Sequence, residues 1–313
     1  MIDTQNSNEK HQRYFRIAGI TIGIESDLDF NEFEFGHELK AFRVSGPGDD
    51  NVLIRHVFDV PDLKGKDFGH VIYNKVPWLI SQKNGTWYYR AISQSEPDKT
   101  LQYGSFTNDH SQATIYTSPS VASSLTSNGW HSLSLFPTDQ IWLTPLLAQR
   151  RAILLHSSAI LLNGMALLFI GHSTAGKSTI VTMLKEASQN GRIAQTTEIL
   201  CDDRNVVRKW DDGWRVHGTW SHGSVSEVSP SSGLLKAVLF LRQEKENRLV
   251  PLKDPMDIYG KLLSTTIKAL TTREWWQKEM DLLAELIREI PFYTVNFDLS
   301  GDIVDSLAKL VTE

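Results

Sequence analysis

Gly171-His172-Ser173-Thr174-Ala175-Gly176-Lys177-Ser178 fits the pattern G-x-x-x-x-G-K-[ST] without a gap, and the elements around it predict the fold. The six residues before it, Met165 to Ile170, are all apolar and predict a buried strand. After it, apolar residues recur at helical spacing, which predicts a helix that begins near Lys177. A strand, a glycine-rich loop and a helix start are the context in which this pattern binds phosphate.

The residue types in this loop predict its chemistry. Glycines let the backbone curl so that successive N–H groups and the positive end of the helix face a phosphate. We expect Lys177 to reach the terminal phosphates and the Ser178 hydroxyl to bind Mg²⁺, with Thr179 completing the nucleotide-binding loop. The pattern reads phosphates and not the base, so both ATP and GTP stay open. A glycine-rich turn that only leads into a helix is the structural alternative.

The composition limits the class of protein. The chain has 313 residues, of which 41% are apolar and 22% charged, so we expect a soluble globular protein with two domains or one large one. It has no run of eighteen apolar residues and a polar start, which predicts a cytoplasmic protein without a membrane partner. The single cysteine, Cys201, agrees with a reducing compartment. A net charge of −5 predicts no nucleic-acid partner.

Residues 1–137 predict a β-rich first domain. Ile20, Ile22 and Ile24 alternate with small residues, and Asn84-Gly85 supplies the positive φ angles of a hairpin turn. The stretch from Ser118 to Asn128 is rich in Ser and Thr and predicts a loop near the domain boundary. Several aromatic residues either fill the core or line a groove for an extended peptide: Trp78, Trp87, Tyr88, Tyr89 and Tyr103.

Residues 138–313 predict a second domain built around the phosphate-binding loop. A two-residue turn at Asn163-Gly164 makes the loop strand the second arm of a hairpin. Opposed residue numbers then sum to 327, which places His156 opposite Gly171 and beside the loop. His156 is therefore a candidate catalytic residue, with a structural histidine as the alternative. Because the hairpin is antiparallel, we expect a mixed sheet in an α/β domain.

The remaining elements of this domain follow from apolar periodicity and turn residues. Thr138-Asp139 predicts a short helix start, although Pro145 implies a kink or a later beginning. The other expected elements are a hairpin through Asp212-Gly213, a strand at 236–241, helices at 255–270 and 273–290, a strand at 292–299 and a last helix from Asp302.

An acidic pair, Asp202-Asp203, follows the apolar strand that ends at Cys201. A phosphate-binding loop needs an acidic partner for its metal, and a phosphoryl transfer to a hydroxyl needs a base. Two neighbouring carboxylates at a strand end can serve both needs. A solvated turn is the structural alternative.

With these residues in hand, the chain resembles the HPr serine kinase/phosphorylase family. The resemblance extends to its kinase-like relatives beside genes for ribosomally made, modified peptides such as lasso peptides. It covers about Leu155 to Leu241 and depends on His156, the loop ending Gly176-Lys177-Ser178-Thr179, and the run Asp202-Asp203-Arg204. It implies the fold shared with phosphoenolpyruvate carboxykinase, in which the loop lies on a mixed sheet.

The resemblance also implies an activity, which is ATP- and Mg²⁺-dependent phosphorylation of a serine in a peptide or protein. Asp202 matches the general base, and Asp203 and Ser178 match the metal ligands. Lys177 matches the phosphate-binding and catalytic lysine. Glu227 matches the acidic residue of the following loop, a further metal ligand.

The acceptor and two other functions stay open at this point. A ribosomal peptide precursor and an HPr-like protein are both candidate acceptors, and a homo-oligomer is an open assembly. The loop departs from the usual family pattern at His172, Ala175 and Thr179. The rival functions are a nucleotide-responsive regulator that transfers no phosphate and a small-molecule phosphotransferase.

Overall fold

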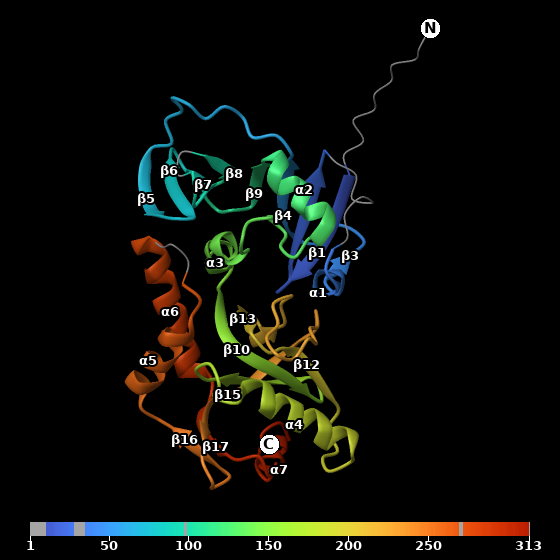
Figure 1. Cartoon of the computed structure of the whole chain (residues 1–313). Helices are drawn as coiled ribbons and strands as arrows, with labels where there is room; N and C mark the ends of the chain where they lie inside the picture. Colours follow the sequence, from blue (N-terminus) through green and yellow to red (C-terminus); the bar gives the residue numbers. More distant parts are fainter. Residues whose placement is uncertain (1–10, 28–34, 97–98, 269–271, 313) are drawn as a thin grey trace. The chain divides into compact units, whose positions relative to one another are not determined.

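The computed structural model of the chain describes residues 11–27, 35–96, 99–268 and 272–312 (Figure 1). The chain divides into two compact units, Met1–Leu146 and Leu147–Glu313. Each unit contains one mixed β-sheet together with helices, so the predicted α/β class is confirmed. The sequence analysis placed the boundary between residues 137 and 138, and the division into units falls within the short helix that follows.

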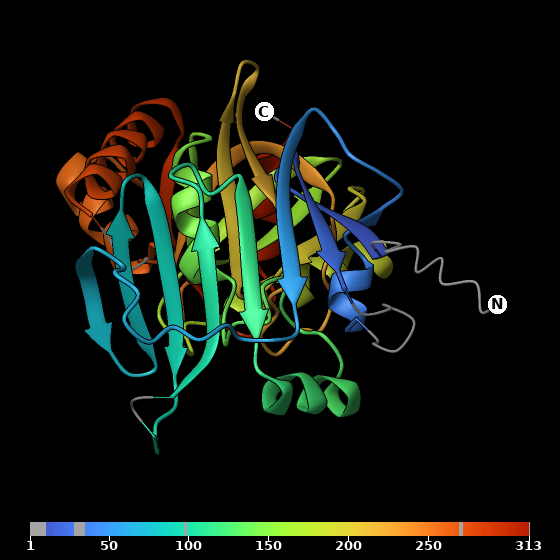
Figure 2. The ribbon, with the colours of Figure 1, turned by 90° about the horizontal axis from the view of Figure 1, so that it is seen from above.

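The described part of unit 1 consists mainly of strands, with two helices and most of a third that continues into unit 2. Its elements are β1 (His11–Ile17), β2 (Ile20–Ser26), α1 (His37–Lys40), β3 (Arg43–Val44), β4 (Asp50–Val57), β5 (His70–Lys75), β6 (Trp78–Lys83), β7 (Thr86–Ile92), β8 (Thr100–Phe106), β9 (Gln112–Thr117), α2 (Pro119–Asn128) and α3 (Gln140–Ala148). The strands form one sheet in the order β3-β1-β2-β4-β9-β8-β7-β6-β5, most of which lies side by side in Figure 2. β4 runs parallel to both of its neighbours, and the other pairs are antiparallel.

The predicted alternation at Ile20, Ile22 and Ile24 does not appear in the burial of β2, because every residue of that strand is buried. Burial does alternate along β4. Val52, Ile54 and His56 of β4 are buried, whereas Arg55 between them is exposed. Lys83 pairs with Thr86, so the predicted Asn84-Gly85 hairpin is confirmed.

The five aromatic residues of unit 1 that the sequence singles out differ in their burial. Trp78 and Tyr89 are buried, and their rings lie 5.2 and 6.4 Å from the ring of Phe136. Tyr103 is buried as well, so the core interpretation is confirmed for these three residues.

One helical segment of unit 1 differs from expectation, and a second agrees with one of two alternatives. The predicted loop at 118–128 is wrong, because Pro119–Asn128 forms α2. Proline at the first helical position costs no hydrogen bond, and the carbonyl of Ser118 accepts from the N–H groups of Val121 and Ala122. The Ser- and Thr-rich composition concealed this start signal. α3 begins at Gln140 and contains Pro145, so the helix is not delayed until after the proline.

Unit 2 contains the longer strands and the longest helix. Its elements are β10 (Ala152–Leu162), β11 (Met165–Ile170), α4 (Lys177–Gln189), β12 (Thr197–Cys201), β13 (Arg204–Trp210), β14 (Gly213–His217), β15 (Ser232–Gln243), β16 (Arg248–Leu252), α5 (Pro255–Thr265), α6 (Arg273–Glu289), β17 (Phe292–Phe297) and α7 (Ile303–Lys309). The strand order is β11-β10-β13-β14-β15-β17-β16, with β12 beside β10. Because β11 also pairs with β15, five strands close into a ring.

The register of the central hairpin agrees with the sequence argument. Leu162 pairs with Met165, and the pairing continues to Ser157 opposite Ile170, so opposed numbers sum to 327 as predicted. β11 is antiparallel to β10 and parallel to β15, which confirms a mixed sheet. The turn between β13 and β14 differs by one residue, because Trp210 pairs with Gly213. Gly213 has a φ of 128° and begins the strand, so residues 211–212 form the turn.

Helices cover the two faces of this sheet. On one face, Phe169 of β11 shares a core cluster with Leu184 of α4 and Ile303 of α7. On the other face, Leu168 packs in a cluster with residues of α5 and α6 (Figure 1). Successive strand residues thus bury opposite faces, and full burial of each large apolar side chain contributes about 1.5–3 kcal/mol. This packing holds in place both β11, which precedes the loop at 171–176, and α4, which follows it.

Side-chain caps fix the starts of two helices. The Asp254 carboxylate accepts from the backbone N–H of Met256 at the start of α5, and the Thr272 hydroxyl accepts from Trp275 N–H at the start of α6. Within the described ranges, no helix combines the length and the apolarity that a membrane span requires.

Candidate functional site

The loop between β11 and α4 has the backbone that its glycines allow. Gly176 has a φ of 97°, and a Cβ there would lie 2.6 Å from the ring of Phe297. A Cβ at Gly171 would lie 2.6 Å from that of Ala175. Only glycine fits both positions without a shift of its neighbours. α4 starts without a side-chain cap, so the N–H groups of its first turn remain available to an anion.

Lys177, the first residue of α4, folds back over the loop. Its Nζ donates to the carbonyl oxygens of Gly171 and His172 at 2.9 and 3.2 Å, and lies 3.2 Å from Nε2 of His156. Burial lowers the pKa of this amine, an effect that the charges of Asp203 and Asp202 oppose. A buried amine held by carbonyl groups is poised to exchange them for a phosphate.

Asp202 lies directly beside the loop. Its carboxylate accepts from the Ser178 hydroxyl at 2.8 Å and from the backbone N–H groups of Gly223 and Val225 at 2.5 and 2.8 Å. Asp202 is 3% exposed. Ser178 also accepts from the Ser224 hydroxyl at 2.8 Å. The structure therefore pairs Ser178 with the first of the two acidic residues and not with the second.

Asp203 has different partners. Its carboxylate lies 3.1 Å from Nδ1 of His156 and 2.6 Å from both the Ser221 hydroxyl and the Arg204 guanidinium. Burial alone would raise the pKa of Asp203, but these hydrogen bonds and charges lower it to about 2. The tight turn between β12 and β13 separates the two carboxylates, since Cys201 Sγ accepts from the N–H groups of both Asp203 and Arg204.

These groups surround one cavity of about 450 Å³. Its lining combines the loop, both acidic residues and the segment after β14: His156, Ser173, Thr174, Gly176, Lys177, Ser178, Thr179, Asp202, Asp203, Gly223, Ser224 and Gln243. The lining is polar and has both positive and negative groups. It is suited to a ligand with several anionic oxygens and a bound cation.

Most of the predicted site residues lie together here, but Glu227 does not. Its carboxylate pairs with Lys185 of α4 at 2.5 Å, and Glu227 is not among the lining residues. Gly171, His172 and Ala175 belong to the loop but do not line the cavity either.

Sequence analysis missed several residues of the site. Gln243 donates to the carbonyl oxygen of Thr174 at 2.9 Å. It ends β15, the parallel neighbour of β11, and carboxyl ends of parallel strands meet at one edge of a sheet. That rule could have identified Gln243. Ser224 has no comparable local signal. Gly223 ends the loop 217–223, whose small residues and histidines predict a phosphate or substrate contact.

The donor set agrees with a hard cation. Ser178 and Asp202 offer a hydroxyl and a carboxylate oxygen, which suit Mg²⁺ when phosphate and water fill its other positions. Among the described residues, no cluster of three or more His, Cys, Asp or Glu side chains could hold a metal ion. Magnesium at nucleotide sites usually takes only one or two carboxylates from the protein.

Comparison with known proteins adds little to this geometry. No family model matches the chain, and no curated protein matches it. Among solved structures, the chain is similar to the Hpr(Ser) kinase/phosphatase from Coxiella burnetii, with 11% sequence identity and a TM-score of 0.29. The match covers 51% of this chain and 88% of that one. A likeness of this size carries no functional argument, so the function must be inferred from the site itself.

Proposed function

We propose that unit 2 binds Mg-ATP and transfers its terminal phosphoryl group to a serine hydroxyl of a peptide or protein. One observation carries the proposal: a phosphate-binding loop pattern, two acidic residues in unlike environments and a histidine line the same cavity. Phosphoryl transfer depends mainly on positioning and on charge stabilisation, and these residue types provide both.

The nucleotide phosphates would lie over the loop. The N–H groups at the start of α4 face an anion there, and Lys177 exchanges its two carbonyl partners for phosphate oxygens. This exchange also takes the amine away from Nε2 of His156, from which it now lies 3.2 Å. Binding of the phosphates thereby leaves the imidazole nitrogen able to accept a proton.

Ser178 and Asp202 would hold the cation. Their oxygens are 2.8 Å apart, and the N–H groups of Gly223 and Val225 fix the Asp202 carboxylate. Bound Mg²⁺ supplies charge neutralisation on the phosphate oxygens. The sequence interpretation gave the metal to Asp203 and the base to Asp202; the hydrogen bond from Ser178 favours the exchange of these roles.

Asp203 and His156 would receive the acceptor proton. Nδ1 of His156 lies 3.1 Å from the Asp203 carboxylate, so that carboxylate orients the ring. Arg204 and Ser221 hold the carboxylate from its other side. The serine hydroxyl then loses its proton to Nε2 as it attacks the terminal phosphorus atom. The bond from that phosphorus to its bridging oxygen breaks, and ADP leaves.

Phosphate transfer from labelled ATP to a pool of serine-containing peptides, resolved by mass, tests the proposal. The wild-type protein should label a subset of the peptides in the presence of Mg²⁺. Lys177→Ala should abolish the labelling, because the variant removes the phosphate contact. It also removes the hydrogen bonds from Nζ to the carbonyl groups of Gly171 and His172, so the thermal midpoint is measured alongside to show that the variant is folded. Lys185→Ala is the matched control, since Lys185 lies on the same helix but pairs with Glu227 outside the cavity. Unchanged labelling by Lys177→Ala would exclude the loop as the active site.

A further inference from the structure

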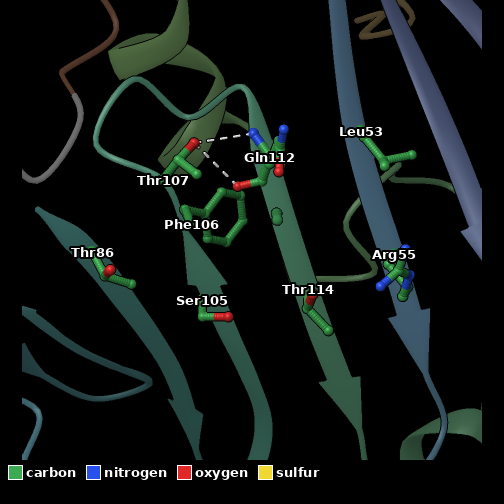
Figure 3. A pocket seen from close by; sticks show the side chains of 9 residues that line it. Leu53, Arg55, Thr86, Ser105, Phe106, Thr107, Gln112 and Thr114 are labelled. Atoms are coloured by element: carbon green, nitrogen blue, oxygen red, sulfur yellow. Dashed lines mark hydrogen bonds between the residues drawn. The ribbon is translucent and has the colours of Figure 1, made fainter.

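Unit 1 has a polar hollow of its own on the open side of its sheet (Figure 3). The hollow measures about 220 Å³ and extends over four neighbouring strands and the β8–β9 turn. Its lining is mostly small and polar: Leu53, Arg55, Thr86, Ser105, Phe106, Thr107, Gln112, Ala113 and Thr114. Neither the phosphate-binding loop nor the acidic pair contributes to it.

Side-chain size explains why the hollow forms. Ser105, Thr114 and Arg55 lie opposite one another on β8, β9 and β4, as Figure 3 shows. Two residues along these strands, the corresponding pair is Tyr103 and Tyr116, whose rings stack 5.5 Å apart. Residues two apart on a strand share a face, so small hydroxyl side chains lie beside a raised row of tyrosines. Neither tyrosine is among the lining residues, so the hollow lies over the row of small side chains.

The lining favours a ligand that both donates and accepts hydrogen bonds. Hydroxyl and carboxamide groups can do either. The charge of Arg55 is largely met by Glu25, whose carboxylate accepts two bonds from its guanidinium at 3.1 Å. Thr107 bonds to the backbone of Gln112, which closes one end of the hollow. The site is therefore built for a polar ligand with little net charge.

We propose that this hollow binds an extended, polar segment of a polypeptide. A peptide backbone presents alternating donors and acceptors, and four strands at a spacing of about 4.8 Å span roughly 14 Å, or about four extended residues. A saccharide would need an exposed aromatic face to stack on. Phe106, the one aromatic side chain in the lining, is only 1% exposed. The identification of this segment as part of the phosphate acceptor rests on the proposed function. The binding of a polar segment in the hollow does not.

Filling the hollow tests the inference without any phosphate transfer. The full-length protein is applied to an array of short peptides rich in Ser, Thr, Gly, Gln and Asn, and in parallel to an array of neutral oligosaccharides. The peptide bound most strongly is then titrated in solution by fluorescence anisotropy. Ser105→Trp and Thr114→Arg should each weaken its binding about tenfold or more, because both block several hydrogen bonds.

Three controls separate this result from misfolding and from the nucleotide site. Asn74→Trp puts the same bulk on an exposed position of β5 and should bind the peptide as the wild type does. Ser105→Thr keeps the hydroxyl and should retain most of the affinity. ATP affinity should stay unchanged in every variant. The proposal is overturned if the wild type binds no peptide or if both filled variants bind the peptide as the wild type does. It is also overturned if the wild type binds a saccharide and the filled variants lose that binding while peptide binding is unchanged.

Discussion

Exchange of Asp202 and Asp203 for asparagine should separate cation binding from proton transfer. The two residues are adjacent, yet one accepts from Ser178 and the other lies against His156. Asparagine retains the size of the side chain and removes its charge. Each variant therefore removes the charge of one carboxylate and leaves the other carboxylate intact. The difference between the two variants shows which residue binds the metal.

The structure sets the expected magnitudes. The Asp202 carboxylate accepts three hydrogen bonds, from the Ser178 hydroxyl and from two backbone N–H groups. In Asp202→Asn, the NH₂ group of the amide would face at least one of these donors, and that hydrogen bond would be lost. A hydrogen bond to a charged group contributes about 1.5–3 kcal/mol, so Asp202→Asn should weaken Mg-ATP binding roughly 10- to 150-fold. Asp203→Asn should keep this affinity within a few-fold but lower the transfer rate by about 10²–10⁴.

The assay is a fluorescence titration with a labelled ATP analogue, with and without Mg²⁺, followed by single-turnover transfer rates. Glu227→Gln is the matched control, because this third acidic residue pairs with Lys185 outside the cavity. It should change neither quantity. Weak Mg-ATP binding by Asp203→Asn with normal binding by Asp202→Asn would refute the reasoning and restore the roles predicted from sequence. Near-normal rates in both variants would refute transfer at this site.

Two further predictions concern single residues of unit 2. Gly176→Ala should lower the thermal midpoint and weaken ATP binding, because an L-residue at a φ of 97° costs about 1–2 kcal/mol and its Cβ would meet Phe297; wild-type affinity in this variant would contradict the described loop. Burial raises the pKa of Glu279 to about 8, so the folded chain retains a proton that the unfolded chain loses near pH 4.3, and stability falls as pH rises between about 4.3 and 8. Glu279→Gln should therefore raise the thermal midpoint more at about pH 9 than at about pH 5, and an equal gain at both values would show that ionisation plays no part.

Local rules were enough for the hairpin that carries the loop. A two-residue turn fixes the pairing of its flanking residues, and a period of two then fixes every later pair. The register from Leu162 to Ser157 follows from Asn163-Gly164 alone, and so does the nearness of His156 to the loop. The same local reasoning failed at 118–128, where a helix start was concealed by a loop-like composition.

The division of partners between Asp202 and Asp203 was decided only by the tertiary structure. Adjacent residues share one sequence environment, and no pattern tells which carboxylate turns toward the loop. Here the segment after β14 returns to the site, and its N–H groups at Gly223 and Val225 hold Asp202 against Ser178. Glu227 illustrates the same limit, since an ion pair with Lys185 holds it outside the lining of the cavity. Contacts between residues far apart in the chain depend on how sheets and helices pack, and local sequence signals do not specify that packing.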